Sequence, residues 1–150
     1  MLGYTVTVCD ARPVFATAKR FPEADHVVVD WPHRWLEQQE VDQRTVIAVL
    51  THDPKFDVPA LKVALATKAG YIGAMGSRRT HEDRVSRLRE AGVSDVELAR
   101  IHSPIGVDIG ARTPEETAIS ICAEIVQHRW GGSGQSLTKT QGPIHPGAPR

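Results

Sequence analysis

The 150-residue sequence has few cysteines, few aromatic side chains and no excess of charge of either sign. Its two cysteines, Cys9 and Cys122, form no C-x-x-C pair, which argues against a disulfide framework and against a thiolate zinc site. Lysine plus arginine and aspartate plus glutamate number 18 each, so the chain lacks the basic excess of a general nucleic-acid binder. This composition is typical of one ordinary globular domain.

Long hydrophobic runs are also missing. No apolar stretch approaches the roughly 20 residues of a membrane span, and the first residues lack the basic-then-apolar order of a signal peptide. We therefore expect a cytoplasmic protein that binds neither a membrane nor nucleic acid.

Short strand patterns alternate with helical patterns along the chain. Apolar and β-branched runs predict strands near residues 4–9, 27–29, 45–50 and 71–72. Helical spacing and capping residues predict helices near residues 13–20, 32–39, 57–65, 77–91, 94–97 and 113–130. This order predicts an α/β domain over residues 1–130, with a Rossmann-like, mostly parallel sheet and helices on both faces. Residues 131–150 are rich in Gly, Pro, Ser and Thr, so we expect a disordered tail there.

In a parallel α/β sheet, ligands bind beyond the carboxyl ends of the strands. Asp10 directly follows the first predicted strand, where a dinucleotide-binding fold uses a carboxylate to accept from both ribose hydroxyls. Alternatively, Asp10 caps the helix predicted over residues 13–20.

Thr51, His52 and Asp53 place a hydroxyl, an imidazole and a carboxylate at the end of the clearest strand. We expect these side chains to project into the crevice. Consecutive turn residues point in different directions, so we do not infer a catalytic triad. A turn that Asp53 stabilises before Pro54 is the structural alternative.

Gly73 and Gly76 precede Ser77 and Arg78 at the start of a predicted helix. Free backbone N–H groups, the positive end of a helix and a nearby guanidinium together favour an anion site. The alternative is a plain N-cap followed by a solvated basic face. We expect that face to carry Arg78, Arg79, Arg84, Arg87 and Arg89.

The segment that contains Asp108 and Gly110 has a similar layout, with glycines leading into a helix start. Capping alone does not explain Asp108. The histidines are scattered without the spacing of a metal cluster, so we interpret them as surface or capping residues and expect no metal bound by protein ligands alone.

Three motifs together resemble the C-terminal Rossmann-like domain of the XdhC/CoxI family of molybdenum hydroxylase maturation factors. They are T-H-D-x-K-x-D over residues 51–57, Y-I-G-x-x-G-S-R-R-T over residues 71–80, and P-I-G-V-D-I-G-A-R-T-P-E-E over residues 104–116. Their order and spacing match those of the family.

The resemblance implies a chaperone-like role more than that of an enzyme. Family members bind the molybdenum cofactor, as molybdopterin or its dinucleotide form, and pass the sulfurated form to an apo-enzyme of the xanthine or carbon monoxide dehydrogenase type. The implied partners are that molybdenum hydroxylase and a cysteine desulfurase. Carried onto this chain, the resemblance assigns phosphate binding to Gly73, Gly76, Ser77, Arg78 and Gly110, a diol contact to Asp10, and the crevice lining to Thr51, His52, Asp53 and Asp108.

Two parts of the family's pattern have no counterpart in this sequence. One is the N-terminal domain with its characteristic cysteine, and the other is the first strand with its Gly-rich turn. Because that strand normally occupies the middle of the sheet, we expect a gap. The chain is then a fragment, or it closes the gap by re-pairing, or it borrows a strand from a second copy. The unblocked edges favour a homo-oligomer.

Two other functions remain open. An NAD(P)-dependent oxidoreductase is supported by the Rossmann-like layout and by Asp10, but the sequence lacks the Gly-rich turn and a Tyr-x-x-x-Lys pair. The other is a module that docks on a partner through an exposed strand edge and binds no ligand.

Overall fold

The computed structural model describes residues 2–145 and shows parallel strands alternating with helices. The elements, in chain order, are β1 (Thr7–Asp10), β2 (His26–Val29), α1 (Pro32–Glu37), β3 (Val46–Val49), α2 (Pro54–Leu65), β4 (Tyr71–Ala74), α3 (Arg78–Glu90), α4 (Asp95–Leu98), β5 (Ile101–His102), α5 (Pro114–Trp130) and the 3-10 helix Leu137–Lys139. Every strand pair is parallel. The predicted α/β class is therefore confirmed.

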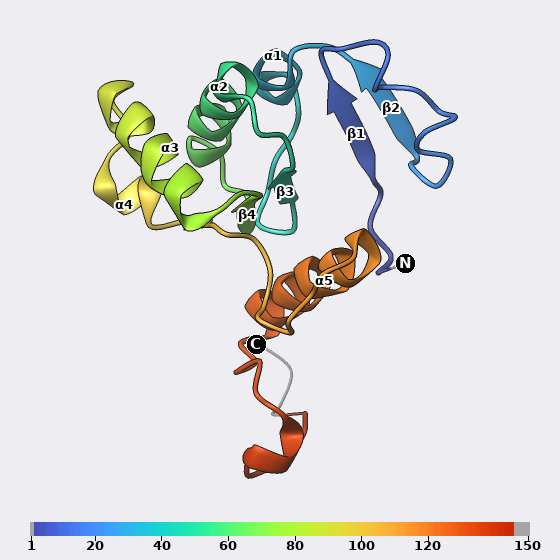
Figure 1. Ribbon diagram of the computed structural model, residues 1–150, viewed down its shortest axis with the longest axis vertical. Coiled ribbons are helices and arrows are strands. Elements are labelled where there is room, and N and C mark those ends of the chain that lie inside the picture. Colours follow the sequence, from blue (N-terminus) through green and yellow to red (C-terminus); the bar gives the residue numbers. More distant parts are fainter. Residues whose placement is uncertain (1, 146–150) are drawn as a thin grey trace.

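The strands form two separate sheets (Figure 1). β1 pairs with β2 in one sheet, and β3, β4 and β5 lie in that order in the other. No ladder among residues 2–145 joins β1 to β3, so each of them is an edge strand. The expected gap in the middle of the sheet is present, and β1 and β3 do not close it by re-pairing.

The core lies against one face of the larger sheet. Ile72 of β4 packs there with Leu61 of α2 and Leu88 of α3, and all three side chains are at most 1% exposed. The opposite face of β4 is turned toward α5, because the Tyr71 hydroxyl donates to Glu124 of that helix over 2.6 Å. Helices therefore cover both faces of the larger sheet, as predicted.

Residues 13–20 form turns, so the helix predicted there is wrong. The Arg12 carbonyl accepts from the backbone N–H groups of Phe15 and Ala16, and the chain then turns again. Val14 and Phe15 are exposed and Ala16 is the one buried residue of this segment, so a helix here would bury little apolar surface. Short helices gain most of their stability from such burial. Because this helix does not form, the alternative role of Asp10 as its cap is also wrong.

Three helix starts follow the sequence closely. The Ser77 hydroxyl accepts from the Thr80 amide at the start of α3, and the Ser94 hydroxyl accepts from the Glu97 amide at the start of α4. At α5, Thr113 forms a complete capping box with the helix's third residue. Each cap pairs a backbone donor that the first helical turn leaves free.

All of residues 131–145 are exposed. Figure 1 shows this part of the chain extending away from the helices and sheets beyond α5. Gly131 ends α5 in the left-handed conformation, with φ of 71°. Leu137–Lys139 then form one turn of 3-10 helix. The boundary near residue 130 and the disorder of the tail stay predictions, and residues 146–150 lie outside the described part of the chain.

Candidate functional site

A buried ion pair joins the turns that follow β3 and β4. Arg84 of α3 and Asp57 of α2 lie 2.8 Å apart, with side chains 2% and 1% exposed. Arg84 also donates to the backbone carbonyls of Met75, over 2.5 Å, and Thr51, over 3.0 Å. The Thr51 hydroxyl donates to the second carboxylate oxygen of Asp57. We call these contacts of Arg84 and Asp57 the Arg84–Asp57 clamp. They hold the first two motifs side by side beyond the carboxyl ends of β3 and β4, which we call the carboxyl edge of the sheet.

The prediction that Arg84 lies on a solvated face is wrong. Arg84 stands four residues before the buried Leu88, so the two side chains share one face of α3. The spacing from Leu88 is the sequence signal that the prediction overlooked. Asp57 belongs to the first motif, but nothing in the sequence revealed a partner 27 residues away.

The turn before α3 combines the predicted N-cap with an unusual backbone. Gly76 has φ of 144°, and a Cβ there would come within 3.1 Å of Thr80 and 3.2 Å of Arg84. The Ser77 hydroxyl accepts from the Thr80 amide over 3.1 Å, which uses one free donor of the first turn. Ser77 and Arg78 are exposed. The N-cap is therefore present, and anion binding at this turn stays a prediction.

In the turn after β3, the side chains of two of the three predicted site residues form hydrogen bonds within the protein. Asp53 caps α2 by accepting from the Lys55 amide over 3.0 Å, as in the structural alternative. The Thr51 hydroxyl is committed to Asp57. His52 is exposed. The side chain with most freedom to meet a ligand at this turn is therefore that of His52.

Asp10 ends β1 and is held by Arg12. The Arg12 Nε and terminal nitrogen donate to the two Asp10 oxygens over 2.9 and 2.8 Å. These hydrogen bonds lower the pKa of the Asp10 carboxyl, so it remains a carboxylate at neutral pH. The Arg12 guanidinium lies over the rings of Phe15, at 4.4 Å, and Phe56 of α2, at 5.2 Å. The carboxyl ends of β1 and β3 thus meet near the start of α2.

The third motif reaches this edge through Ile105. The Ile105 amide donates to the carbonyl of Ala74, the last residue of β4, over 3.1 Å. Asp108 accepts from the Gly110 amide over 3.3 Å, and both residues are exposed. Within residues 2–145, no hydrogen bond or ion pair joins Asp108 or Gly110 to the turns after β1, β3 and β4. Their part in the site stays a prediction.

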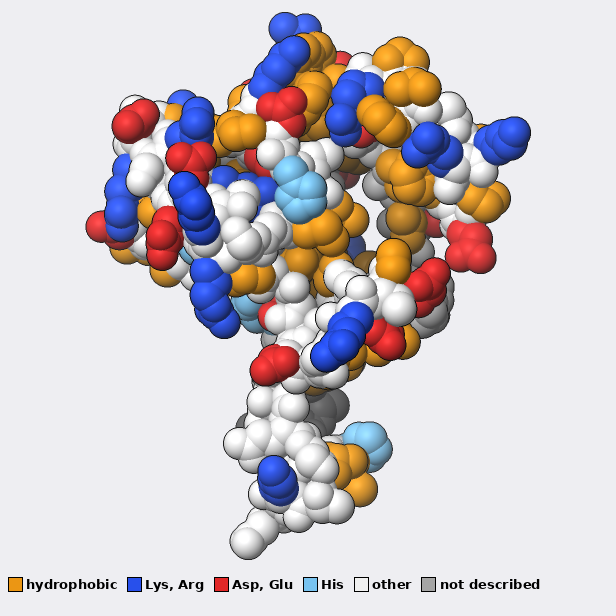
Figure 2. Space-filling view, viewed as in Figure 1, with side chains coloured by type: hydrophobic (Ala, Val, Ile, Leu, Met, Phe, Trp, Pro, Cys, Tyr) orange, Lys and Arg blue, Asp and Glu red, His pale blue; other side chains and the backbone are white. Residues whose placement is uncertain are grey.

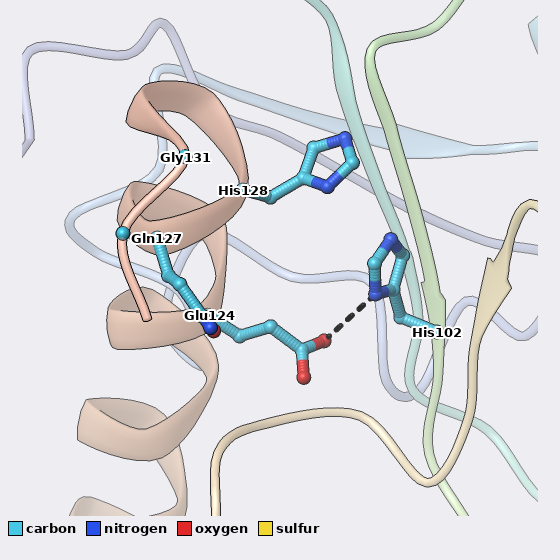
Figure 3. A pocket seen from close by; sticks show the side chains of 6 residues that line it. His102, Glu124, Gln127, His128 and Gly131 are labelled. Carbon is cyan, nitrogen blue, oxygen red and sulfur yellow. Dashed lines mark ion pairs between the residues drawn. The ribbon is translucent and has the colours of Figure 1, made fainter. Parts of the chain in front are cut away.

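A polar cluster on the α5 face of the sheet was not predicted (Figure 3). The His102 ring stacks on Tyr71, with centroids 4.7 Å apart, and its Nδ1 lies 3.5 Å from Glu124. His128 contacts the Gly70 carbonyl over 2.8 Å. Burial lowers the pKa of His102. The His102 side chain is half-buried, so its interpretation as a surface residue is corrected. Its partners lie far away in sequence, so no spacing predicted the cluster.

The hollow beside this cluster has a volume of about 360 Å³ and is lined by His102, Glu124, Gln127, His128, Gly131 and Gly132. It lies apart from the turns that carry the predicted site residues. Among residues 2–145, no three His, Cys, Asp or Glu side chains form a group that could hold a metal ion.

Cys9 should resist alkylation at pH 8. Burial raises the pKa of its thiol to about 11, helped by the charge of Asp30, so only about 0.1% of it is the reactive thiolate at pH 8. Iodoacetamide labelling followed by mass spectrometry should show slow modification of Cys9 that accelerates toward pH 11. Labelling of Cys9 at pH 8 as fast as that of free cysteine would contradict this expectation.

Comparisons with known proteins agree with the motifs. The model of the XdhC Rossmann domain matches residues 1–125. A protein of Bacillus subtilis that is named as a probable xanthine dehydrogenase component is 32% identical over 127 residues, which are 85% of this chain and 36% of that protein. "Molybdenum cofactor insertion chaperone PaoD" of Escherichia coli is 37% identical over 90 residues, which are 60% of this chain and 28% of that protein.

A solved structure shows the same fold. The crystal structure described as a xanthine dehydrogenase from Bacillus halodurans superimposes with a TM-score of 0.72 at 30% sequence identity, covering 89% of this chain and 38% of that one. The chain spans about a third of the length of the relatives it matches. The family model covers most of the chain and the superposition extends over the same fold, so the protein belongs to the XdhC family and corresponds to its Rossmann domain.

Proposed function

We propose that the protein is a maturation factor that binds the molybdenum cofactor and delivers it to a molybdenum hydroxylase of the xanthine or carbon monoxide dehydrogenase type. The observation that carries this proposal is the Arg84–Asp57 clamp. It fixes two turns side by side at the edge where parallel α/β sheets bind ligands. The Escherichia coli relative, whose name is that of a cofactor insertion chaperone, supports the same function.

The cargo is molybdopterin or its dinucleotide form, and both carry phosphate. The turn before α3 fits an anion, because the bare backbone of Gly76 leads into a helix N-terminus and Arg78 is exposed beside it. Asp10 would accept hydrogen bonds from a diol of the cargo, while His52 would line the crevice. Gly73, Gly110 and Asp108 complete the set of residues that we propose for the ligand.

The proposed partners are the apo-hydroxylase, a cysteine desulfurase and a second copy of the chain. The cysteine desulfurase would supply the sulfur of the sulfurated cargo. No helix within residues 2–145 is long and apolar enough to cross a membrane. We propose the cytoplasm as the location.

An activation assay tests this function. The purified chain is incubated with molybdenum cofactor and then with apo-hydroxylase, and both the activity and the molybdenum content of the hydroxylase are measured. We expect the chain to accelerate activation and Arg78→Ala to reduce that effect. Arg87→Ala is the matched control, because it removes an equal charge from an exposed position on the same helix.

Two results of this assay would contradict the proposal. One is activation at the same rate with and without the chain. The other is tight binding of NAD(P) accompanied by hydride transfer, which would favour the oxidoreductase that the position of Asp10 also suggests.

Asp10→Asn should weaken cargo binding by about 1–3 kcal/mol, the range for a hydrogen bond to a charged group. The amide keeps the shape of the carboxyl but loses the charge that pairs with Arg12, and because the Arg12 side chain is 40% exposed this loss should change folding little. Calorimetric titration of both proteins with the cofactor measures the difference. Equal affinities would leave Asp10 with the single role of holding Arg12.

A further inference from the structure

The hollow beside the polar cluster lies between α5 and the larger sheet. His102 belongs to β5, and Glu124 and His128 stand one helical turn apart on α5 (Figure 3). His128 contacts the carbonyl of Gly70, the residue directly before β4, so the hollow lies near the amino end of that strand. The turns that we propose for the cargo follow the carboxyl ends of the strands. The hollow is therefore separate from them.

The contacts of the two imidazole rings indicate which nitrogens carry protons. His128 Nε2 lies 2.8 Å from the Gly70 carbonyl, an oxygen that can only accept, so Nε2 is the donor. His102 Nδ1 lies 3.5 Å from a Glu124 carboxylate oxygen, which favours the proton on that nitrogen. Burial lowers the pKa of His102, so this ring is neutral at pH 8. In neutral rings His128 Nδ1 and His102 Nε2 are then both acceptors.

The hollow also favours a positive charge. The Tyr71 hydroxyl donates to one oxygen of Glu124 over 2.6 Å, and within residues 2–145 the carboxylate has no lysine or arginine partner. Gly131 and Gly132 complete the lining at the C-terminal end of α5, where the helix dipole is negative. Arg100 lines an adjoining hollow, but its guanidinium is held by three backbone carbonyls after α2.

The lining does not suit an apolar or an anionic ligand. None of the residues that line the hollow has an apolar side chain. Figure 2 shows hydrophobic side chains gathered around a different place, the opening between the two sheets. The volume of about 360 Å³ suits a small molecule, since pockets for such ligands measure roughly 300–1,000 Å³. The complementary group is a cation with several N–H donors.

We propose that this hollow binds a small aliphatic amine through its primary ammonium group. One N–H donates to His102 Nε2 and a second donates to His128 Nδ1, while the positive charge lies against the Glu124 carboxylate. Figure 3 shows the two rings and this carboxylate bordering the same space. The Gln127 amide, which also lines the hollow, offers the rest of the ligand an acceptor and a donor.

NMR signals of the histidine ring nitrogens test the proposal in the full chain at pH 8, without any cofactor. The probe is butylammonium chloride, and the matched control is tetramethylammonium chloride, which has the same charge but no N–H donor. We expect butylammonium to shift the signals of His102 and His128 with half-saturation at about 1 mM or below. Tetramethylammonium should bind at least about tenfold more weakly. The exposed His52, at the carboxyl edge, should not respond.

Two variants separate the charge from the acceptor. Glu124→Gln removes the negative charge and should weaken butylammonium binding by about tenfold or more. Glu115→Gln is the matched control, because it removes an equal charge from an exposed position in the first turn of the same helix. His102→Phe keeps a ring beside Tyr71 but removes the acceptor, so it should also weaken binding. Circular dichroism checks that the variants fold, and the comparison of the two ammonium ions needs no variant.

Three results would overturn the proposal. The first is no movement of the His102 and His128 signals at butylammonium concentrations up to about 10 mM. The second is equal binding of tetramethylammonium, because attraction to the charge alone would then account for the effect. The third is binding of Nα-acetyl-lysine amide about tenfold tighter than that of butylammonium, because the occupant would then be a lysine side chain of a polypeptide.

Discussion

Arg84→Met should lower the free energy of unfolding by about 3–5 kcal/mol, because it leaves the Asp57 carboxylate buried without its cation. The side chains of the pair are 2% and 1% exposed, so water cannot replace the lost partner. Urea denaturation of the variant and the parent chain measures the change.

Arg87→Met is the matched control, because Arg87 is 52% exposed and pairs with a similarly exposed Asp83. Such surface pairs contribute about 0–1 kcal/mol. The double variant Arg84→Met with Asp57→Leu should recover much of the lost stability, because no buried charge then remains unpaired. An equal loss of unfolding free energy in Arg84→Met and Arg87→Met would contradict the stabilising role of the Arg84–Asp57 clamp.

Gly73→Val should destabilise the protein by about 1–3 kcal/mol through overpacking. A Cβ at Gly73 would lie 2.5 Å from the Ile105 side chain and 2.8 Å from the Tyr71 hydroxyl, so both neighbours would have to move. Thermal unfolding of the variant measures the loss. Gly132→Ala is the control, because the nearest atom to a Cβ there is 3.9 Å away.

This result bears on the role of Gly73 in the second motif. The structure gives it a packing role, since its missing side chain leaves room on the α5 side of β4 for the side chains of Ile105 and Tyr71. A Gly73→Val variant that keeps the stability of the parent would contradict that role. Phosphate binding by Gly73 itself stays a prediction.

Local patterns predicted most of the fold. β-branched runs indicated β2 and β3, and hydroxyl caps indicated the starts of α3, α4 and α5, because these signals act within a few residues of the element they form. The expected gap came from the family resemblance and not from local patterns, because it rests on the family's first strand, which has no counterpart in this sequence. Residues 13–20 show the limit, because Ala16 is the one buried residue of that segment and the helix that their pattern favours would gain little from packing.

The candidate site was less predictable. Its turns were located correctly at the strand ends, but the residues that fix them, Arg84 and Asp57, come from two helices that meet only in the folded chain. The same reason applies to Tyr71 and Glu124, which are 53 residues apart. Side-chain partners across such distances depend on packing, which one sequence does not reveal.

The most direct test of the account is an anaerobic titration of the chain with molybdenum cofactor, followed through the backbone amide signals in NMR spectra. We predict that the shifts concentrate in the turns after β1, β3 and β4, at Asp10, at residues 51–53 and at residues 76–78. Arg78→Ala should weaken this binding, and Arg87→Ala should leave it unchanged. Shifts confined to the hollow lined by His102 and His128, or no shifts at all, would contradict the claim that the carboxyl edge holds the cargo.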